Sequence, residues 1–276
     1  MLISIADPDD PRIEPYRSVR ERDLLGRDGL FVAEGEVVLR VLLGRSSRFP
    51  VESILLSEKR LDSARPLLAR APGETPVLVA SQPVMDRIVG FPIHRGVLAL
   101  ARRGAEPTAA DILRSLGPRA LVVALIGLAN HDNVGGVFRN AAAFGADAVL
   151  LDRTSCDPLY RKAIRVSVGG SLVVPFARGS EAEAVLETLH AHGFALLGLS
   201  PSGEERIEDV RRSGRTALLL GAEGAGLPAA VLAATRRVRI PMAAGFDSLN
   251  VATASGIALH RLMGGGTPLP EGEEQG

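Results

Sequence analysis

The chain has 276 residues, and its 32 lysine and arginine residues balance 32 aspartate and glutamate residues, which gives a formal net charge of zero. This balance excludes a histone-like protein or one that binds nucleic acid through a basic tail, but it leaves room for a local basic groove. Apolar residues make up 46% of the chain, enough for two buried cores, and the length predicts about two domains.

The single cysteine, Cys156, cannot form an internal disulfide, and no group of cysteine and histidine residues has the spacing of a zinc site. We therefore expect no metal and a cytoplasmic location. The N-terminus turns acidic after five residues and lacks the basic start and apolar stretch of a signal peptide. The longest apolar run, at residues 120–129, is about half of what crosses a bilayer, so we expect no membrane span.

Helix and strand signals alternate from residue 12 to about residue 103, and we take residues 1–103 as the first domain. An apolar stripe at Val37, Val38, Val41 and Leu42 predicts an amphipathic helix. Short strands are predicted at residues 51–56, 76–80 and 96–101. This alternation is typical of a small α/β layer domain.

A stretch rich in charge, glycine and proline follows, and we take residues 104–117 as a linker. The second predicted domain, residues 118–265, contains apolar runs without polar alternation at residues 120–127, 148–151, 172–176, 194–199, 217–220 and 238–240. Such runs are typical of strands covered on both faces, hence of a mostly parallel sheet with helices on both faces. The composition of residues 266–276 predicts a flexible acidic tail.

Basic residues gather in three clusters, each of which is either a solvated face or a site for a polyanion. We favour the first two for contact with a polyanion. The clusters are Arg12/Arg17/Arg20/Arg22, Arg161/Lys162/Arg165 and Arg236/Arg237/Arg239.

Three loops after apolar strands are rich in glycine and small residues, and ligands of open α/β sheets bind beyond the carboxyl ends of the strands. In motif 1, residues 130–140, we expect Asn133 to cap a helix. Gly135 and Gly136 weaken a first turn by about 1 kcal/mol each relative to alanine, so we expect a ligand or another backbone to approach them closely. Arg139 follows one turn later on the same face, either above that space or as an ordinary surface arginine.

Motif 2, residues 220–228, places three glycines around Glu223 after a buried strand, which favours a backbone loop wrapped around a small molecule. Alternatively, Glu223 only caps backbone N–H groups. The spacing G-x-x-G-x-G differs from the dinucleotide fingerprint, which argues against a nucleotide-dependent oxidoreductase.

Motif 3, residues 240–256, ends a strand, forms a loop and opens a helix rich in alanine, serine and glycine. Small side chains permit close contact with another element or another subunit. We expect Asp247 or Ser248 to be the N-cap of this helix.

Taken in this order, the three motifs resemble the SpoU-type RNA ribose 2′-O-methyltransferases of the SPOUT superfamily over residues 118–265. The first domain more loosely resembles the small RNA-binding domain of that family, related to ribosomal proteins, at residues 31–38 and 94–97. The matching patterns are Asn133-x-Gly-x-x-x-Arg139, Gly221-Ala-Glu223-Gly-x-Gly and Ile240-Pro-Met-x(5)-Ser248-Leu-Asn250-Val-Ala-x-Ala.

The resemblance implies a deep trefoil knot in the sheet domain, S-adenosylmethionine as the cofactor, and a homodimer. It implies that the cofactor is bound by Gly221, Glu223, Gly226, Ile240, Met242, Leu249 and Asn250. It implies a catalytic centre made of Asn133, Arg139, Glu223, Ser248 and Asn250. With the first two basic clusters, the expected RNA contacts are Arg12, Arg17, Arg20, Arg22, Arg95, Arg161, Lys162 and Arg165.

The expected reaction is methylation of a ribose 2′-hydroxyl in structured RNA, with ribosomal RNA ahead of transfer RNA because of the additional first domain. The family proposal makes Arg139 the base, but arginine guanidinium groups stay protonated in proteins. We prefer that Arg139, in a site shared with the partner subunit, binds the phosphate beside the target ribose and polarises its hydroxyl. The alternatives are a transfer RNA methyltransferase and a non-catalytic RNA-binding or ribosome-assembly factor, against which the intact catalytic positions argue.

Overall fold

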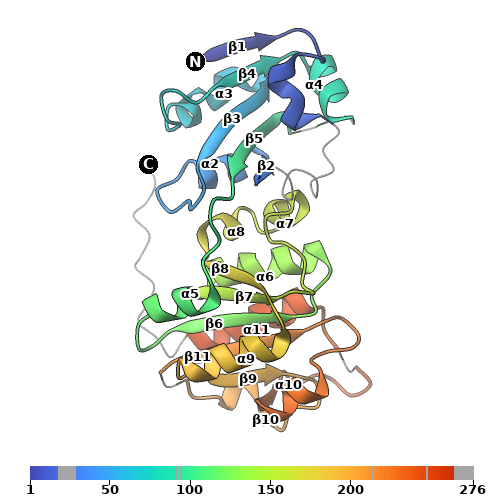
Figure 1. Ribbon diagram of the computed structural model, residues 1–276. Helices are drawn as coiled ribbons and strands as arrows, with labels where there is room; N and C mark the ends of the chain where they lie inside the picture. Colours follow the sequence, from blue (N-terminus) through green and yellow to red (C-terminus); the bar gives the residue numbers. More distant parts are fainter. Residues whose placement is uncertain (18–28, 91–92, 94, 213, 247, 264–276) are drawn as a thin grey trace. The chain divides into compact units, whose positions relative to one another are not determined.

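The structure is a computed structural model that describes residues 1–17, 29–90, 93, 95–212, 214–246 and 248–263 (Figure 1). Contacts divide it into two units. The first unit comprises Met1–Glu106 and Asp157–Val173, and the second comprises Pro107–Cys156 and Val174–Gly276. Residues 157–173 fall within the range predicted for the second domain, yet they pack with the first unit. The predicted tail, residues 266–276, lies outside the described residues.

A five-stranded mixed sheet forms the centre of the first unit, in the order β1-β4-β3-β5-β2. The strands are β1 Leu2–Ile5, β2 Leu30–Glu34, β3 Val51–Ser57, β4 Val77–Ala80 and β5 Val97–Arg102. β4 pairs in parallel with β1 and β3, and β5 pairs antiparallel with β3 and β2. The three predicted strands of this unit are present. The sequence patterns did not predict β1, a four-residue edge strand.

The helices of the first unit are η1 Pro11–Tyr16, α2 Glu36–Leu42, α3 Glu58–Leu68, α4 Gln82–Val89, α7 Arg161–Val166 and α8 Gly170–Val173. The apolar stripe predicted for α2 is partly wrong, because Val38, Leu39 and Leu42 are buried whereas Val37 is 55% exposed. Positions 38, 39 and 42 follow the spacing of three and four residues that keeps side chains on one helix face.

A seven-stranded sheet forms the centre of the second unit, in the order β10-β12-β9-β11-β6-β7-β8. Every strand pairing in it is parallel among the described residues. The strands are β6 Leu121–Ile126, β7 Ala148–Asp152, β8 Phe176–Ser180, β9 Ala195–Leu199, β10 Glu205–Arg206, β11 Thr216–Gly221 and β12 Arg236–Arg239.

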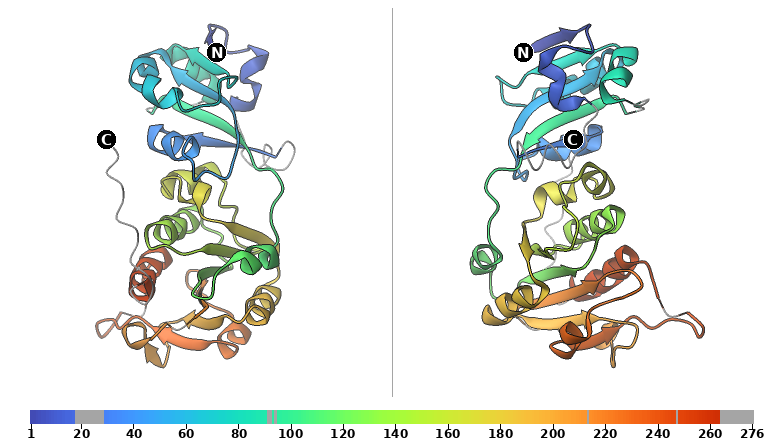
Figure 2. Two further views of the ribbon diagram at one scale, coloured as in Figure 1. Left: turned by 90° about the vertical axis from the view of Figure 1, so that its left-hand side faces the viewer. Right: turned by 45° about the vertical axis from the view of Figure 1, so that its right-hand side comes forward.

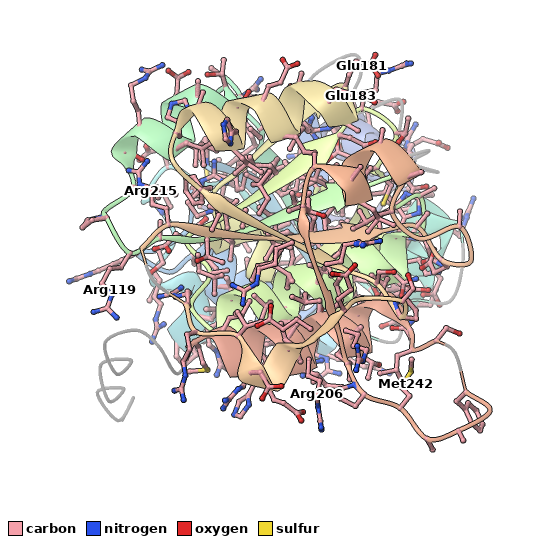
Figure 3. The ribbon with its side chains drawn as sticks, turned by 90° about the horizontal axis from the view of Figure 1, so that it is seen from below. Arg119, Glu181, Glu183, Arg206, Arg215 and Met242 are labelled. Carbon is pink, nitrogen blue, oxygen red and sulfur yellow. The ribbon has the colours of Figure 1, made fainter. Side chains whose placement is uncertain are left out.

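Helices cover both faces of this sheet (Figure 3). One face packs against α5 Ala109–Ser115, α9 Ala182–Ala191 and α10 Ala229–Ala233. On the other face α6 His131–Ala143 lies beside α11 Val251–Met263, as both views of Figure 2 show. A short turn of helix, η2 Ile207–Asp209, follows β10. The prediction of a mostly parallel sheet between two helical layers is confirmed.

Two local expectations need revision. The run at 172–176 is not one strand, because residues up to Val173 belong to α8 and β8 begins at Phe176. An apolar run by itself does not distinguish a buried helix from a buried strand. The predicted linker contains α5, which Thr108 caps by accepting a hydrogen bond from the Asp111 N–H at 3.1 Å. None of the helices in the described ranges is long and apolar enough to cross a membrane.

Candidate active site

Motifs 1, 2 and 3 each begin where a parallel strand of the second unit ends. Motif 1 follows β6, motif 2 follows β11 and motif 3 follows β12. β6 and β11 are neighbours in the sheet, and β9 lies between β11 and β12. Because parallel strands present their carboxyl ends at one edge of the sheet, the three motifs gather at that edge.

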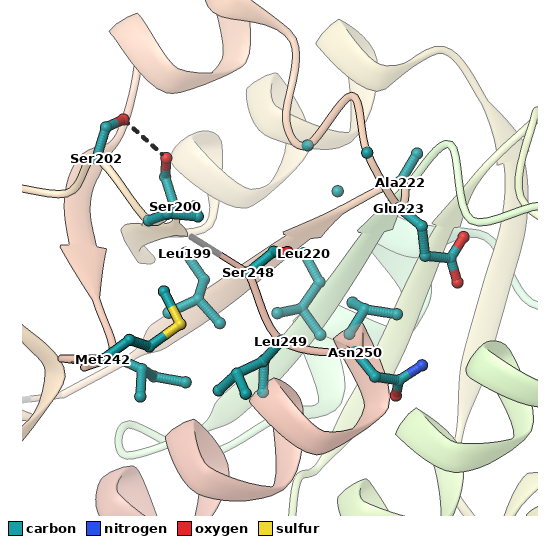
Figure 4. Close-up of a pocket in the computed structure, with 17 residues that line it drawn as sticks. Leu199, Ser200, Ser202, Leu220, Ala222, Glu223, Met242, Ser248, Leu249 and Asn250 are labelled. Atoms are coloured by element: carbon teal, nitrogen blue, oxygen red, sulfur yellow. Dashed lines mark hydrogen bonds between the residues drawn. The ribbon is translucent and has the colours of Figure 1, made fainter. Parts of the chain in front are cut away.

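A cavity of about 720 Å³ opens at this edge (Figure 4). Its walls come from three segments that follow β9, β11 and β12: residues 199–202, residues 220–224 with Gly226, and Ile240, Met242, residues 248–251 and Ala254. The volume falls within the range of about 300 to 1,000 Å³ that is typical of small-molecule sites. All seven residues predicted to bind the cofactor line this cavity: Gly221, Glu223, Gly226, Ile240, Met242, Leu249 and Asn250.

The motif 2 loop turns back on itself so tightly that residue 221 has no room for a side chain. A Cβ atom on Gly221 would lie 2.2 Å from the carbonyl carbon of Gly226 and 2.3 Å from the nitrogen of Leu227. The Gly226 N–H donates to the carbonyl oxygen of Ala222 at 2.9 Å, which closes the turn. Glycine at 221 is therefore required by the loop itself, and backbone groups form this wall of the cavity.

The sequence motifs did not predict one wall of the cavity. Residues 199–202 follow β9, and the hydroxyl groups of Ser200 and Ser202 lie 3.0 Å apart at the cavity (Figure 4). The apolar run at 194–199 predicts the strand but carries no motif beyond it. Strand order identifies this wall. Because β9 pairs with both β11 and β12, its carboxyl end lies between theirs.

Motifs 1 and 3 are joined by a side-chain hydrogen bond across 117 residues of sequence. The Asn250 Nδ2 donates to Asn133 Oδ1 at 2.9 Å, and Asn133 is buried. Asn250 Oδ1 in turn accepts from the N–H groups of Ala252 and Thr253 at 3.0 and 3.2 Å, which fixes the start of α11.

Both expected helix caps are therefore revised. Asn130, not Asn133, caps α6, since its side chain accepts from the Asp132 N–H at 2.8 Å. Asn250 performs this role at α11 instead of Ser248, and Asp247 lies outside the described residues. Asparagine recurs four times in motifs 1 and 3, so residue type alone did not select the capping position.

Close packing between α6 and α11 explains the small residues of both motifs. A Cβ atom on Gly136 would lie 2.5 Å from the Cβ atom of Ala252, so only glycine fits at this crossing. Asn140 Nδ2 donates to the Ala252 carbonyl oxygen at 2.7 Å and to Ser255 Oγ at 2.8 Å. The close approach predicted for Gly136 is to another helix rather than to a ligand.

The five predicted catalytic residues divide into two groups. Glu223, Ser248 and Asn250 line the cavity, and Asn133 contacts it through Asn250. Arg139 is exposed on α6 and is not part of the cavity lining. No hydrogen bond or ion pair joins Arg139 or Glu223 to another residue in the described part of the chain.

A buried carboxylate supports the loop that leads into motif 1. Asp152, at the end of β7, is 4% exposed. Its Oδ1 accepts from the Gly127 N–H at 3.1 Å and from the Ser155 N–H and hydroxyl at 2.8 and 2.6 Å, while Thr154 donates to Oδ2. Ser155 Oγ accepts in turn from the Leu128 N–H at 3.0 Å. Asp152 therefore holds the backbone from which motif 1 departs.

The first basic cluster is engaged with acidic neighbours. Arg12 pairs with Asp10 and, through a side-chain hydrogen bond, lowers the pKa of that carboxyl to about 2. Arg17 pairs with Asp9 at 3.4 Å and with Glu14 at 3.1 Å. Arg20, Arg22 and His94 lie outside the described residues.

The other two clusters differ in their partners. Arg161 and Arg165 of α7 each lie 3.8 Å from buried Glu34, whereas Lys162 and Arg95 are exposed. Arg236 and Arg237 pair with glutamates of the β10 edge, and Arg239 donates to two carbonyl oxygens there. In the described part of the chain, no three His, Cys, Asp or Glu residues are grouped so as to hold a metal ion.

The sequence model of the SpoU rRNA Methylase family matches residues 120–260, which span all three motifs and the cavity. The chain belongs to this family. A protein of Mycobacterium bovis that is named as an uncharacterized tRNA/rRNA methyltransferase is 43% identical over 266 residues, 93% of this chain and 90% of that protein. The 23S rRNA (guanosine-2′-O-)-methyltransferase RlmB of Acinetobacter baylyi is 32% identical over 186 residues, 66% of this chain and 75% of RlmB.

The SpoU fold extends over nearly the whole chain. The SpoU methyltransferase AviRb of Streptomyces viridochromogenes superimposes with a TM-score of 0.79 over 92% of this chain and 98% of AviRb, at 24% identity. The chain therefore has the α/β trefoil-knot fold of SpoU methyltransferases, as the motifs predict.

Replacing Gly221 by alanine tests the backbone wall of the cavity. The added Cβ has no room against Gly226, so we expect Gly221→Ala to lower the free energy of unfolding by about 1 to 3 kcal/mol. Gly117→Ala is the matched control, because its Cβ would meet nothing within 4 Å; its effect should stay within about 1 kcal/mol. Equal denaturant midpoints for the two variants would contradict this reading of the loop.

Two replacements of Asp152 should show whether its acceptor oxygens or its negative charge stabilise the loop before motif 1. Asp152→Ala leaves the Gly127 and Ser155 donors without their acceptor and should cost about 2 to 4 kcal/mol of unfolding free energy. Asp152→Asn retains one carbonyl oxygen for those donors and should cost about half as much or less. Chemical denaturation measures both, and a loss as large for asparagine as for alanine would show that the carboxylate acts through its charge alone.

Proposed function

We propose that the cavity binds S-adenosylmethionine and that the chain transfers its methyl group to a ribose 2′-hydroxyl of structured RNA. The observation that carries the proposal is the convergence of motifs 2 and 3 on one cavity, with motif 1 hydrogen-bonded to its wall. Membership of the SpoU family makes the chain an RNA methyltransferase. RlmB methylates a 2′-oxygen of 23S rRNA, and AviRb has been crystallised with S-adenosylmethionine.

The residues around the cavity fit this cofactor. Leucine, isoleucine and methionine side chains offer an apolar surface for a flat base, and the motif 2 turn offers backbone polar groups where no side chain intervenes. Glu223 adds a carboxylate to the lining, which complements a cofactor that carries a positive charge. Size, apolar lining and charge therefore agree with S-adenosylmethionine.

When bound, S-adenosylmethionine supplies a methyl group on a positively charged sulfur, which keeps the electron pair of the broken bond. The protein must align the 2′-oxygen with that methyl group and ease the loss of the hydroxyl proton. The Asn250 side chain lines the cavity and is held in place by hydrogen bonds with Asn133 and with two N–H groups of α11. Arg139 binds the phosphate beside the target ribose and polarises its hydroxyl, because a guanidinium donates hydrogen bonds but does not readily accept a proton.

The complete site requires a second copy of the chain in this proposal. Arg139 lies outside the cavity lining of its own chain, so it would serve the cavity of a partner subunit. Exposed apolar side chains on motif 3 and α11 support a homodimer: Phe246 is 77% exposed, Leu249 43% and Ile257 42%. Apolar groups at a surface mark protein contacts when they gather in a patch.

We propose ribosomal RNA as the substrate ahead of transfer RNA, and the cytoplasm as the location. The support is the first unit, which adds surface for a large RNA, and the similarity to RlmB. The relative from Mycobacterium bovis carries both substrates in its name, so transfer RNA is the second candidate.

Arg139→Ala should abolish methyl transfer while S-adenosylmethionine binding is preserved. We expect turnover to fall at least about 100-fold, the size of effect seen when a transition-state donor is removed. Arg114→Ala is the control, since Arg114 is an exposed arginine of α5 that pairs with Asp111 of its own helix. Transfer of labelled methyl groups to ribosomal RNA and calorimetric titration with S-adenosylmethionine measure the two quantities, and near-normal turnover of Arg139→Ala would refute the assigned role.

Cofactor titration also separates the enzyme from a non-catalytic RNA-binding factor on the same scaffold. We expect saturable binding of one S-adenosylmethionine per cavity by the full-length protein. A protein that binds RNA with the same affinity but takes up no cofactor would instead be an assembly factor.

A further inference from the structure

The chain segment between β9 and β10 crosses over β12 at the edge of the sheet where the cavity lies. β12 is flanked by β9 on one side and by β10 on the other. Leu199, the last residue of β9, and Glu205, the first residue of β10, both lie opposite Val238 of β12. Residues 200–204 therefore pass from one side of β12 to the other at the level of Val238. We call residues 200–204 the crossing loop.

The crossing loop lies so close to β12 that residue 203 has no room for a side chain. A Cβ atom on Gly203 would lie 2.6 Å from the Val238 carbonyl oxygen and 2.8 Å from the Arg239 nitrogen. The Ser200 N–H donates to the Val238 carbonyl oxygen at 2.9 Å, and the Gly203 N–H donates to the Ser200 carbonyl oxygen at 3.0 Å. The loop is thus a tight turn that rests on the backbone of β12.

Arg239 of β12 binds the far end of the crossing loop. Its Nη1 atom donates to the carbonyl oxygens of Gly203 and Glu204, at 2.6 and 2.8 Å. A guanidinium carries several N–H donors in one plane, so a single group can bind two adjacent carbonyl oxygens. Gly203 is buried, and a buried carbonyl oxygen needs a donor. Arg239 supplies that donor and ties the loop to the strand that it crosses.

The near end of the crossing loop lines the cavity. Ser200, Pro201 and Ser202 belong to the lining, whereas Arg239 does not. The hydroxyl groups of Ser200 and Ser202 lie 3.0 Å apart (Figure 4). When one of these hydroxyls donates to the other, the acceptor keeps its own proton for a ligand. The loop therefore brings a pair of hydroxyl groups to a wall that no sequence motif marks.

The other two arginines of the third basic cluster have a different kind of partner. Arg236 and Arg237 are exposed and pair with the side-chain carboxylates of Glu205 and Glu204. Exposed ion pairs contribute little to the stability of a fold. Arg239 instead binds main-chain oxygens of the crossing loop, so its removal acts on the path of the backbone.

We propose that Arg239 is a positioning residue for cofactor binding. It fixes the crossing loop on β12 and thereby places the Ser200 and Ser202 hydroxyl groups, which bind polar groups of S-adenosylmethionine. This inference rests on the proposed function for the identity of the ligand. It gives the third basic cluster a role other than RNA contact, through an arginine that lies outside the cavity lining.

Calorimetric titration of the full-length protein with S-adenosylmethionine tests the inference. We expect Arg239→Ala to raise Kd about 5- to 20-fold, because the two carbonyl oxygens lose their donor and the loop is released. Arg239→Lys should recover part of the loss, since an ammonium group also donates to carbonyl oxygens. Arg236→Ala is the matched control on the same strand, because its partner is the Glu205 side chain; its Kd should change less than 2-fold.

A double-mutant cycle shows whether Arg239 acts through the serines. We expect the variant with Ser200→Ala and Ser202→Ala to raise Kd at least as much as Arg239→Ala. Adding Arg239→Ala to that variant should change Kd less than 2-fold further, because the hydroxyl groups that Arg239 places are already absent. Denaturant midpoints of the same proteins establish that each titrated variant is folded.

A folded Arg239→Ala with the Kd of the wild type would overturn the inference. An equal effect of Arg239→Ala with and without the two serines would also overturn it, because a general structural role has that signature. If Arg239→Ala does not fold, the serine variant decides, and a wild-type Kd for that variant would overturn the inference. A wild-type protein that binds no cofactor would overturn the proposed function itself, whereas wild-type binding that Arg239→Ala weakens only in the presence of the serines supports the inference.

Discussion

The site depends on backbone segments that approach one another more closely than any side chain permits. At Gly221 the motif 2 loop closes on Gly226 with no space for a Cβ atom, and at Gly136 helix α6 crosses α11 at Ala252 in the same way. The first approach forms a wall of the cavity, and the second brings motif 1 to the chain segment that completes the other wall. Asn133 and Asn250, which lie far apart in the sequence, are thereby brought to one place by backbone packing rather than by loop flexibility.

Polar groups then fix the direction in which the chain leaves each strand. Asp152 holds the backbone after β6 through Gly127 and Ser155, and Asn250 joins motif 3 to Asn133 while it caps α11. Asp152 and Asn133 are themselves buried, so an alternative loop conformation would leave their polar groups unpaired away from water. Arg139 differs from Asp152 and Asn133, because it is exposed and has no partner in the described part of the chain. This contrast suits a residue whose ligand is supplied by RNA.

The large features of this protein were predictable because they leave periodic or ordered signals. Unbroken apolar runs predict the buried parallel strands, and motifs 2 and 3 predict two of the three loops that form the cavity. The capping residues were not predictable, since Asn130, Asn133 and Asn250 are chemically equivalent and only the path of the backbone selects between them. Residues 199–202 carry no motif, and their role follows from strand order. The partnership of Glu34 with Arg161 and Arg165 depends on a contact across more than a hundred residues, which no local pattern reports.

The net charge of zero is accompanied by many ion pairs within the chain. Arg12 and Arg17 of the first cluster and Arg236 and Arg237 of the third pair with acidic neighbours, which leaves fewer guanidinium groups for contact with RNA. An aromatic content of only 4% leaves few side chains for base stacking, so we expect contacts with phosphate groups and RNA shape to dominate.

The central claim is that this chain methylates ribose in cellular RNA. It is tested most directly by mapping 2′-O-methylation across ribosomal and transfer RNA from cells with and without the gene. The account predicts that one or a few methylated riboses, in ribosomal RNA, disappear without the gene and return when the wild-type chain is supplied. An unchanged methylation map in both RNA classes would contradict it.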